Sequence, residues 1–123
     1  IRKSPHFPFI VIVGRRQDYR TVGGRIIRKS EYSVLARLFS MQKMHHAYAV
    51  TGAICTAVAA KIPNSVVNQL CEESDNKVII GHPKGLIDLE VEMVHTRGSV
   101  KIKSVTIGRT ARRLMAGIAY YIP

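Results

Sequence analysis

The sequence predicts an α+β fold in which one buried helix packs against strands. The helix is expected within Met41–Pro63, because Ala53–Ala60 contains no charge, glycine or proline and is apolar on every side, as is typical of a helix inside a core. This run is too short for a membrane span, which needs about 20 apolar residues. Strands are expected at Leu86–Val94 and Val100–Ile107, where apolar and charged residues alternate.

The composition fits one domain and favours anionic partners. The chain has 123 residues and a formal net charge of +11, and such a surplus suits nucleic acid, acidic lipid or small polyacids. The basic residues are spread along the chain, and aromatic residues make up only 7% of it, which gives little support for base stacking. A small basic nucleic-acid-binding module is therefore kept only as an alternative function.

The two cysteines predict neither a metal site nor a disulfide framework. Cys55 and Cys71 lack a metal-binding spacing, and Cys55, inside the apolar helix, is expected to be a small core residue. Free thiols fit the reducing cytoplasm, which is the expected location. The chain starts at Ile1 without a methionine, so we expect it to be a piece of a longer polypeptide.

The part of the chain before the central helix predicts a strand, a loop and a short helix. Phe9–Val13 is a continuous apolar run, typical of a strand buried on both faces. Arg15–Gly24 is expected to be a loop. Ser30 can cap a helix that continues to Phe39, and Met41–Tyr48 is expected to be extended.

The start of the central helix is the most informative point of the sequence. The helix is predicted to begin at Thr51-Gly52, where the Thr51 hydroxyl can cap free N–H groups, and to end near Ile62, because Pro63 cannot continue it. Free N–H groups and the positive end of the helix dipole suit a carboxylate or a phosphate. From the residues alone, an ordinary core helix explains the same stretch.

After the helix the sequence predicts mostly strands. Val66–Leu70 is a possible strand, and Glu72–Asn76 reads as an acidic loop. Lys77–Ile80 and Leu86–Val94 flank a Gly-His-Pro-Lys-Gly turn, and Val94–Ser99 is expected to be the next loop.

The last two predicted strands suggest a register and a bulge. Placing Glu92 opposite Lys101 pairs opposite charges and sets Val91 opposite Ile102 on the dry face. The apolar phase slips beyond Ser104, which indicates a bulge. Gly108–Ala111 is then expected to turn the chain into a final strand at Arg112–Ile122, broken at Gly117.

Three segments occur in an order that resembles a known family: MQKMHHAYAVTGAICTAVAA, VIIGHPKGLIDLEVE and VTIGRTARRLMAGIAY. They resemble the C-terminal part of the PrpF family, which includes 2-methylaconitate cis–trans isomerases, aconitate isomerases and 4-oxalomesaconate tautomerases. The resemblance implies a diaminopimelate-epimerase-like half, a mixed, mostly antiparallel barrel-like sheet around a central buried helix. It implies a cofactor-independent isomerase that moves a proton and a double bond in an unsaturated tricarboxylate.

The resemblance also implies that this chain is incomplete. Residues 1–123 match the C-terminal half-domain of a two-half isomerase, and the N-terminal half, which carries the family's main acid/base cysteine and lysine, has no counterpart. Related epimerases have a catalytic cysteine just before the Thr-Gly pair, where this chain has Ala49 or a near neighbour. The catalytic residues therefore stay unknown. The expected partners are a small tricarboxylate and either the missing half or another copy of the chain, as in a homodimer, with no nucleic acid and no membrane.

The resemblance assigns substrate binding to the start of the central helix. The backbone N–H groups of Thr51, Gly52 and Ala53, together with the Thr51 hydroxyl, are implied to cradle a carboxylate, and Val50 is counted among the substrate-binding residues. A relative that keeps this pocket but has lost catalysis, a non-catalytic carboxylate-binding protein, is a further alternative.

Four cationic or titratable side chains complete the candidate set. Lys43, His45 and His46 approach the helix start and could pair with a second carboxylate or pass a proton. Adjacent strand residues point to opposite faces, so only one histidine can face the site, and we favour His46. The same geometry argues against a histidine metal pair, and no metal is expected. Arg109, in the turn after Gly108, could reach a carboxylate or be solvated at the surface.

Overall fold

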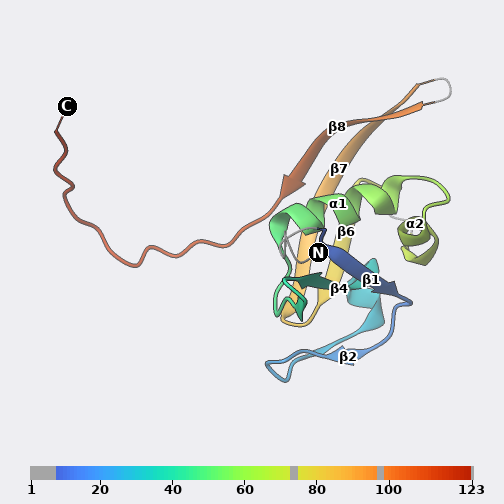
Figure 1. Ribbon diagram of the computed structural model, residues 1–123, viewed down its shortest axis with the longest axis horizontal. Helices are drawn as coiled ribbons and strands as arrows, with labels where there is room; N and C mark the ends of the chain where they lie inside the picture. Colours follow the sequence, from blue (N-terminus) through green and yellow to red (C-terminus); the bar gives the residue numbers. More distant parts are fainter. Residues whose placement is uncertain (1–7, 73–74, 97–98, 123) are drawn as a thin grey trace.

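The computed structural model describes residues 8–72, 75–96 and 99–122 (Figure 1). In chain order the elements are β1 (Ile10–Gly14), β2 (Tyr19–Arg20), β3 (Ile26–Ile27), a 3₁₀ turn (Lys29–Glu31), β4 (Val34–Ser40), β5 (Lys43–Met44), α1 (Val50–Lys61), α2 (Val66–Leu70), β6 (Lys77–His82), β7 (Gly85–Thr96) and β8 (Ser99–Ile107). The predicted α+β class is confirmed.

The sheet is mixed and mostly antiparallel, as predicted. Its strand order is β1-β4-β6-β7-β8, with β5 added beside β4, and β2 and β3 form a separate two-stranded hairpin. The strand pair β4 and β6 is parallel, and the other recorded pairs are antiparallel. The connection between the parallel strands carries α1 and α2, which lie across one face of the sheet in Figure 1. This crossover puts α1 against the centre of the sheet.

The core lies between α1 and the sheet, and it is built of small residues on the helix and larger ones on the strands. The buried positions of α1 are Gly52, Ala53, Thr56, Ala57 and Ala60. They meet branched side chains from three central strands, Val34 and Leu38 of β4, Val78 and Ile80 of β6, and Leu89 and Val91 of β7. Small helix residues permit a close approach, so the predicted central buried helix is confirmed for this face.

The opposite face of α1 is not covered within the described chain. Cys55 is exposed, and Ile54 and Val58 are half-buried. The prediction that Cys55 lies in the core is therefore wrong. Because α1 is apolar all round, its sequence predicts burial on every side. The described strands pack against only one side of it.

Two N-terminal predictions are also wrong: the burial of the first strand and the helix expected at Ser30–Phe39. β1 is an edge strand rather than a strand buried on both faces, since Ile10 and Ile12 are 56% and 58% exposed. Ser30–Phe39 is not a helix: Ser30 lies in the 3₁₀ turn and the apolar run forms β4. β4 is buried on both faces because Leu35 packs with Ile27 and Tyr32 on the side away from α1.

The segments around α1 hold three further differences. The predicted loop Arg15–Gly24 contains β2. The segment Met41–Tyr48, predicted to be extended, begins with a tight turn at Met41 and Gln42, which have positive φ of 51° and 63°, and β5 follows that turn. Val66–Leu70 is the helix α2 rather than a strand, because the Ser65 hydroxyl caps it by accepting the N–H of Asn68 at 3.0 Å.

The long C-terminal strands are confirmed, but their register is not the predicted one. The dry face of β7 is confirmed, since Leu89 and Val91 are buried. Glu92 lies opposite Ser104 and Val91 opposite Val105, and the pairing continues to Thr96–Ser99 where a loop was predicted. The predicted bulge is present one residue earlier, between the partners of Glu92 and Met93. It leaves Lys103 as the extra residue, and its Nζ still lies 3.1 Å from a Glu92 carboxylate oxygen.

Residues 108–122 follow β8 without forming a strand, so the predicted final strand is wrong. Figure 1 shows this segment running away from the sheet. Its apolar side chains are exposed, for example Leu114 at 81% and Tyr120 at 94%. The acidic loop predicted at Glu72–Asn76 is free of helix and strand where it is described, and residues 73–74 lie outside the described residues. Within the described ranges, no helix has the length and apolar character needed to cross a bilayer.

Candidate substrate-binding site

The start of α1 offers three backbone N–H groups. Ala49 is the N-cap residue and makes no side-chain capping bond, and the first intrahelical bond runs from the Ala53 N–H to the Ala49 carbonyl at 2.8 Å. The helix therefore provides no acceptor for the N–H groups of Val50, Thr51 and Gly52. These groups lie at the positive end of the helix dipole, where an anion is stabilised.

Two parts of the prediction for this helix start are corrected. Thr51 is not the cap, because the helix begins at Val50 and Thr51 is its second residue, with an exposed side chain. The Ala53 N–H is not available to a substrate, because Ala49 already accepts its hydrogen bond. The cradle is thus one residue earlier than the Thr-Gly pair suggested.

A hollow of about 610 Å³ lies beside this helix start. Its lining residues come from the segment before α1 and the first residue of α1, from the end of β6 and the start of β7, and from the segment after β8: Ala47, Tyr48, Val50, His82, Leu86, Ile87, Asp88, Gly108, Arg109 and Thr110. Two of the predicted site residues, Val50 and Arg109, therefore share one space. A carboxylate there could meet the helix N–H groups and the Arg109 guanidinium together.

The three predicted residues before the helix lie further out. Lys43 is in β5, and the backbone N–H of His45 donates to the Leu38 carbonyl at 2.7 Å, which extends the hairpin. The side chains of Lys43, His45 and His46 are exposed, and none of the three lines the hollow. The positive charge of His45 is the last of the causes that lower the pKa of His82, after burial and the charge of Arg37. The preference for His46 stays a prediction.

His82 lines the same hollow but is not among the predicted site residues. The sequence placed it in the Gly-His-Pro-Lys-Gly turn, but it ends β6 and is only 7% exposed. Its ring lies 6.3 Å from the Tyr48 ring. Burial is the main cause that lowers the pKa of His82; the positive charges of Arg37 and His45 act in the same direction, and the Leu86 carbonyl acts against them. The available signal was the alternation of Val78, Ile80 and His82 on one face of β6.

Tyr48 fixes the segment that leads into α1. Thr56 Oγ1 donates its single proton to the Gly52 carbonyl at 2.8 Å, so the Tyr48 hydroxyl must be the donor in its 3.0 Å bond to Thr56 Oγ1. Burial raises the pKa of Tyr48, which keeps this donor protonated. One side chain thus ties the approach segment to the first turns of the helix.

The turn that carries His82 is held from the other face of the sheet. The Tyr19 hydroxyl lies 3.1 Å from the His82 carbonyl and 2.7 Å from the Gly85 carbonyl. The Arg37 guanidinium lies over the Tyr19 ring, 5.2 Å from its centre. These contacts hold the β6–β7 turn, and with it the end of β6 that lines the hollow, in a fixed position.

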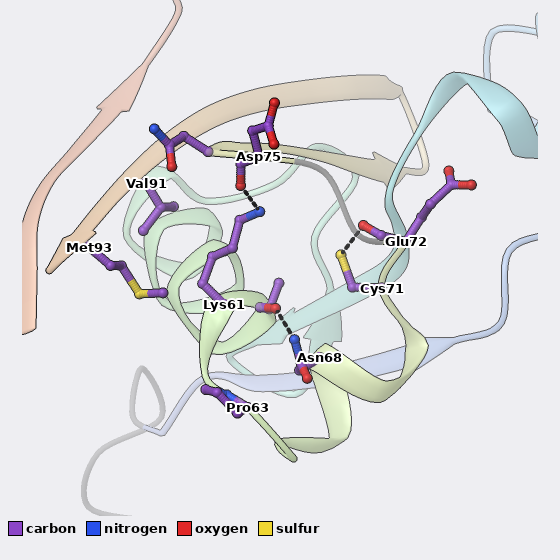
Figure 2. A pocket seen from close by; sticks show the side chains of 10 residues that line it. Lys61, Pro63, Asn68, Cys71, Glu72, Asp75, Val91 and Met93 are labelled. Carbon is purple, nitrogen blue, oxygen red and sulfur yellow. Dashed lines mark hydrogen bonds between the residues drawn. The ribbon is translucent and has the colours of Figure 1, made fainter. Parts of the chain in front are cut away.

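A second hollow, of about 700 Å³, lies at the opposite end of α1 (Figure 2). Its polar groups are largely engaged: Lys61 donates to the Asp75 carbonyl, and Asn68 donates to the Ala60 carbonyl at 2.8 Å. Burial raises the pKa of the Cys71 thiol, which makes it a poor nucleophile. The C-terminal end of a helix dipole also disfavours anions. In the described ranges, no group of three or more metal-binding side chains comes together.

Comparisons with known proteins match nearly the whole chain to one family. A family model described as PrpF protein matches residues 1–122. The chain is 38% identical over 121 residues to a 3-methylitaconate isomerase from Eubacterium barkeri, covering 96% of this chain and 31% of that protein. It is 33% identical over 116 residues to a 2-methyl-aconitate isomerase from Cupriavidus necator, covering 94% and 29%.

A solved structure has a fold similar to that of this chain. The crystal structure of a methylitaconate-delta-isomerase superposes with a TM-score of 0.72 at 33% identity, covering 87% of this chain and 29% of that one. The chain therefore spans roughly 30% of the length of the relatives it matches. Because the family model covers residues 1–122, the chain belongs to the PrpF family.

Proposed function

We propose that this chain is the C-terminal half-domain of a cofactor-independent isomerase acting on an unsaturated tricarboxylate such as 2-methylaconitate or aconitate. The observation that carries the proposal is that Val50, the first residue of α1, and Arg109 line the same hollow, which brings a helix N-terminus and a cationic residue to one place. The names of the relatives, which are isomerases of methylitaconate and 2-methylaconitate, support it.

In the proposed reaction a base breaks a C–H bond next to the double bond of the substrate. The electron pair spreads over the allylic system and an attached carboxylate, and the proton then returns to a different carbon, or to the same one after rotation. Hydrogen-bond donors placed where this charge develops lower the barrier. The N–H groups of Val50, Thr51 and Gly52 suit that role, and Arg109 suits a second carboxylate.

The base itself is expected outside this chain. Ala49 stands near the place where related epimerases have a cysteine, and Cys55 lies more than one turn inside α1. We therefore propose that the N-terminal half of the same protein, or another copy, supplies the acid and base and covers the exposed side of α1. Two free cysteines also fit a cytoplasmic location, which is part of the proposal.

The test is proton exchange by the full-length protein that contains this chain. The protein would be incubated in D₂O with cis-aconitate, 2-methylaconitate and methylitaconate separately, and each acid followed by proton NMR. We expect deuterium to enter at least one acid, because the protonated base can exchange its proton with the solvent before the proton returns to the substrate. An acid that binds without exchange would instead favour the non-catalytic carboxylate-binding protein. Exchange by residues 1–123 alone would contradict placing the base elsewhere.

A further inference from the structure

We infer that Tyr48 is a positioning residue for the acid bound beside α1, because its hydroxyl begins a chain of hydrogen bonds that ends at the free N–H of Val50. The inference rests on the proposed function, in which that N–H holds a carboxylate. Tyr48 and Val50 both line the hollow, but the Tyr48 hydroxyl is bonded to Thr56 and therefore acts through the helix.

The first two hydrogen bonds of the chain lie in the core and have a fixed direction. Thr56 Oγ1 lies 2.8 Å from the Gly52 carbonyl oxygen, which can only accept, so the proton of the Thr56 hydroxyl is used there. The Tyr48 hydroxyl, 3.0 Å from Thr56 Oγ1, must then donate. Tyr48 and Thr56 are 6% and 4% exposed, and burial raises the pKa of Tyr48, so its hydroxyl keeps the proton that it donates.

Two peptide groups carry the chain from Gly52 to Val50. The Gly52 carbonyl belongs to the same planar peptide group as the Ala53 N–H, which donates to the Ala49 carbonyl at 2.8 Å. The Ala49 carbonyl belongs to the same peptide group as the Val50 N–H, for which the helix provides no acceptor. Every bond of the chain therefore donates in one direction, from Tyr48 toward Val50.

Such a chain strengthens and orients its last donor. Hydrogen bonds in a low-dielectric interior polarise one another, by about 10–30% per bond, so the Val50 N–H becomes a better donor to a carboxylate. The Tyr48 ring also lies 6.3 Å from the His82 ring, which holds the segment just before the helix against the end of β6. The N–H groups of Thr51 and Gly52 belong to other peptide groups and lie outside the chain.

Three substitutions interrupt or restore the chain, and a fourth is a matched control. Tyr48→Phe removes only the first hydroxyl, Thr56→Val removes the second, and Thr56→Ser keeps it. Tyr32→Phe removes another buried hydroxyl, since Tyr32 is 2% exposed and donates to the Gln17 carbonyl at 2.6 Å, away from α1. All variants are made in the ¹⁵N-labelled full-length protein, with citrate as the probe.

We expect the loss of the Tyr48 hydroxyl to be felt at Val50. Without ligand, Tyr48→Phe should move the Val50 amide proton signal upfield, and by more than the signals of Thr51 and Gly52. Tyr48→Phe and Thr56→Val should each weaken citrate binding by about threefold, whereas Thr56→Ser and Tyr32→Phe should bind citrate as the wild type does. Because both losses interrupt one chain, the Tyr48→Phe/Thr56→Val double variant should bind no more weakly than Thr56→Val.

The inference is overturned if Tyr48→Phe leaves the Val50 signal and the citrate affinity unchanged, if Tyr32→Phe weakens binding equally, or if the wild type does not bind citrate. Additive losses in the double variant would also contradict a single chain. If no acid exchanges protons in D₂O but citrate binding depends on the Tyr48 hydroxyl as expected, the proposed reaction fails and the inference stands. If protons exchange while Tyr48→Phe behaves as the wild type, the inference alone fails.

Discussion

Replacing Gly52 by alanine tests the close approach that places the helix start against the sheet. A Cβ built at Gly52 would lie 2.2 Å from Leu38 Cδ1 and 3.8 Å from Phe9 Cδ2. Carbon atoms pack favourably at about 3.5–4.0 Å, and Leu38 is fully buried, so the new methyl group cannot be accommodated without moving the helix or Leu38. Gly52 has no positive φ, and space alone decides the outcome.

The size of the effect is the difference between two opposing contributions. Overpacking a core by one methyl group costs about 1–3 kcal/mol, and the severity of this contact places Gly52→Ala near the upper value. Alanine favours a helix over glycine by about 0.5–1 kcal/mol. We therefore expect Gly52→Ala to lower the free energy of unfolding by about 2 kcal/mol.

Urea unfolding of the full-length protein measures this effect, with Gly14→Ala as the matched control. A Cβ at Gly14 meets nothing within 4 Å, so its replacement should change stability by no more than about 0.5 kcal/mol. Leu38→Val removes the opposing atom, and a double-mutant cycle should give a coupling energy of about 0.5–3 kcal/mol. If Gly52→Ala is as stable as the wild type, or if the two effects simply add, the close contact does not exist.

Three further predictions concern the caps, the turn and the buried histidine. Ser65→Ala should lower the free energy of unfolding by about 1 kcal/mol, because α2 loses its cap. An unchanged free energy of unfolding in urea would contradict that cap. Gln42→Gly should stabilise by about 1 kcal/mol, because the native φ of 63° is costly for a side chain; a melting temperature below that of the wild type would count against the turn. The stability contributed by neutral His82 should be fully present above its ordinary pKa of 6.5 and be lost as the pH falls below it, because burial lowers the folded-state pKa and the unfolded state takes up the proton first. Unfolding measured from pH 7.5 to 5.5 checks this, and His82→Asn should be less sensitive to pH; an equal slope in both proteins would refute it.

The elements with long, unambiguous patterns could be predicted, and the short or doubly buried ones could not. α1 was predictable from its long apolar run, and β7 from its alternation of apolar and charged residues. β4 was taken for a helix because an apolar run buried on both faces has no strand alternation to distinguish it. α2 has only five residues, and its Ser65 cap was the one local signal. The β7–β8 register was wrong because pairing Glu92 with Lys101 satisfies the charges as well as the real pairing does.

For the site too, features encoded in neighbouring residues could be predicted, and contacts between distant parts of the chain could not. The helix start was predicted as an anion site from its own residues and from the family resemblance, and the structure places Val50 and Arg109 on one hollow. The exact set of free N–H groups depends on where the helix begins, which differs by one residue from the Thr-Gly signal. His82 was missed because its meeting with Tyr48 joins the end of β6 to the segment before α1, and no local pattern reports such a contact.

The central claim is that the start of α1 holds a substrate carboxylate, and amide NMR tests it directly. The full-length protein, ¹⁵N-labelled, would be titrated with cis-aconitate while the amide signals of α1 are followed. We predict saturable downfield shifts for Val50, Thr51 and Gly52, because their N–H groups gain a charged acceptor, and little change for Ala53, whose N–H is already bonded to Ala49. Saturable binding that leaves the first three amides unmoved, or moves Ala53 as much as its neighbours, would contradict the account.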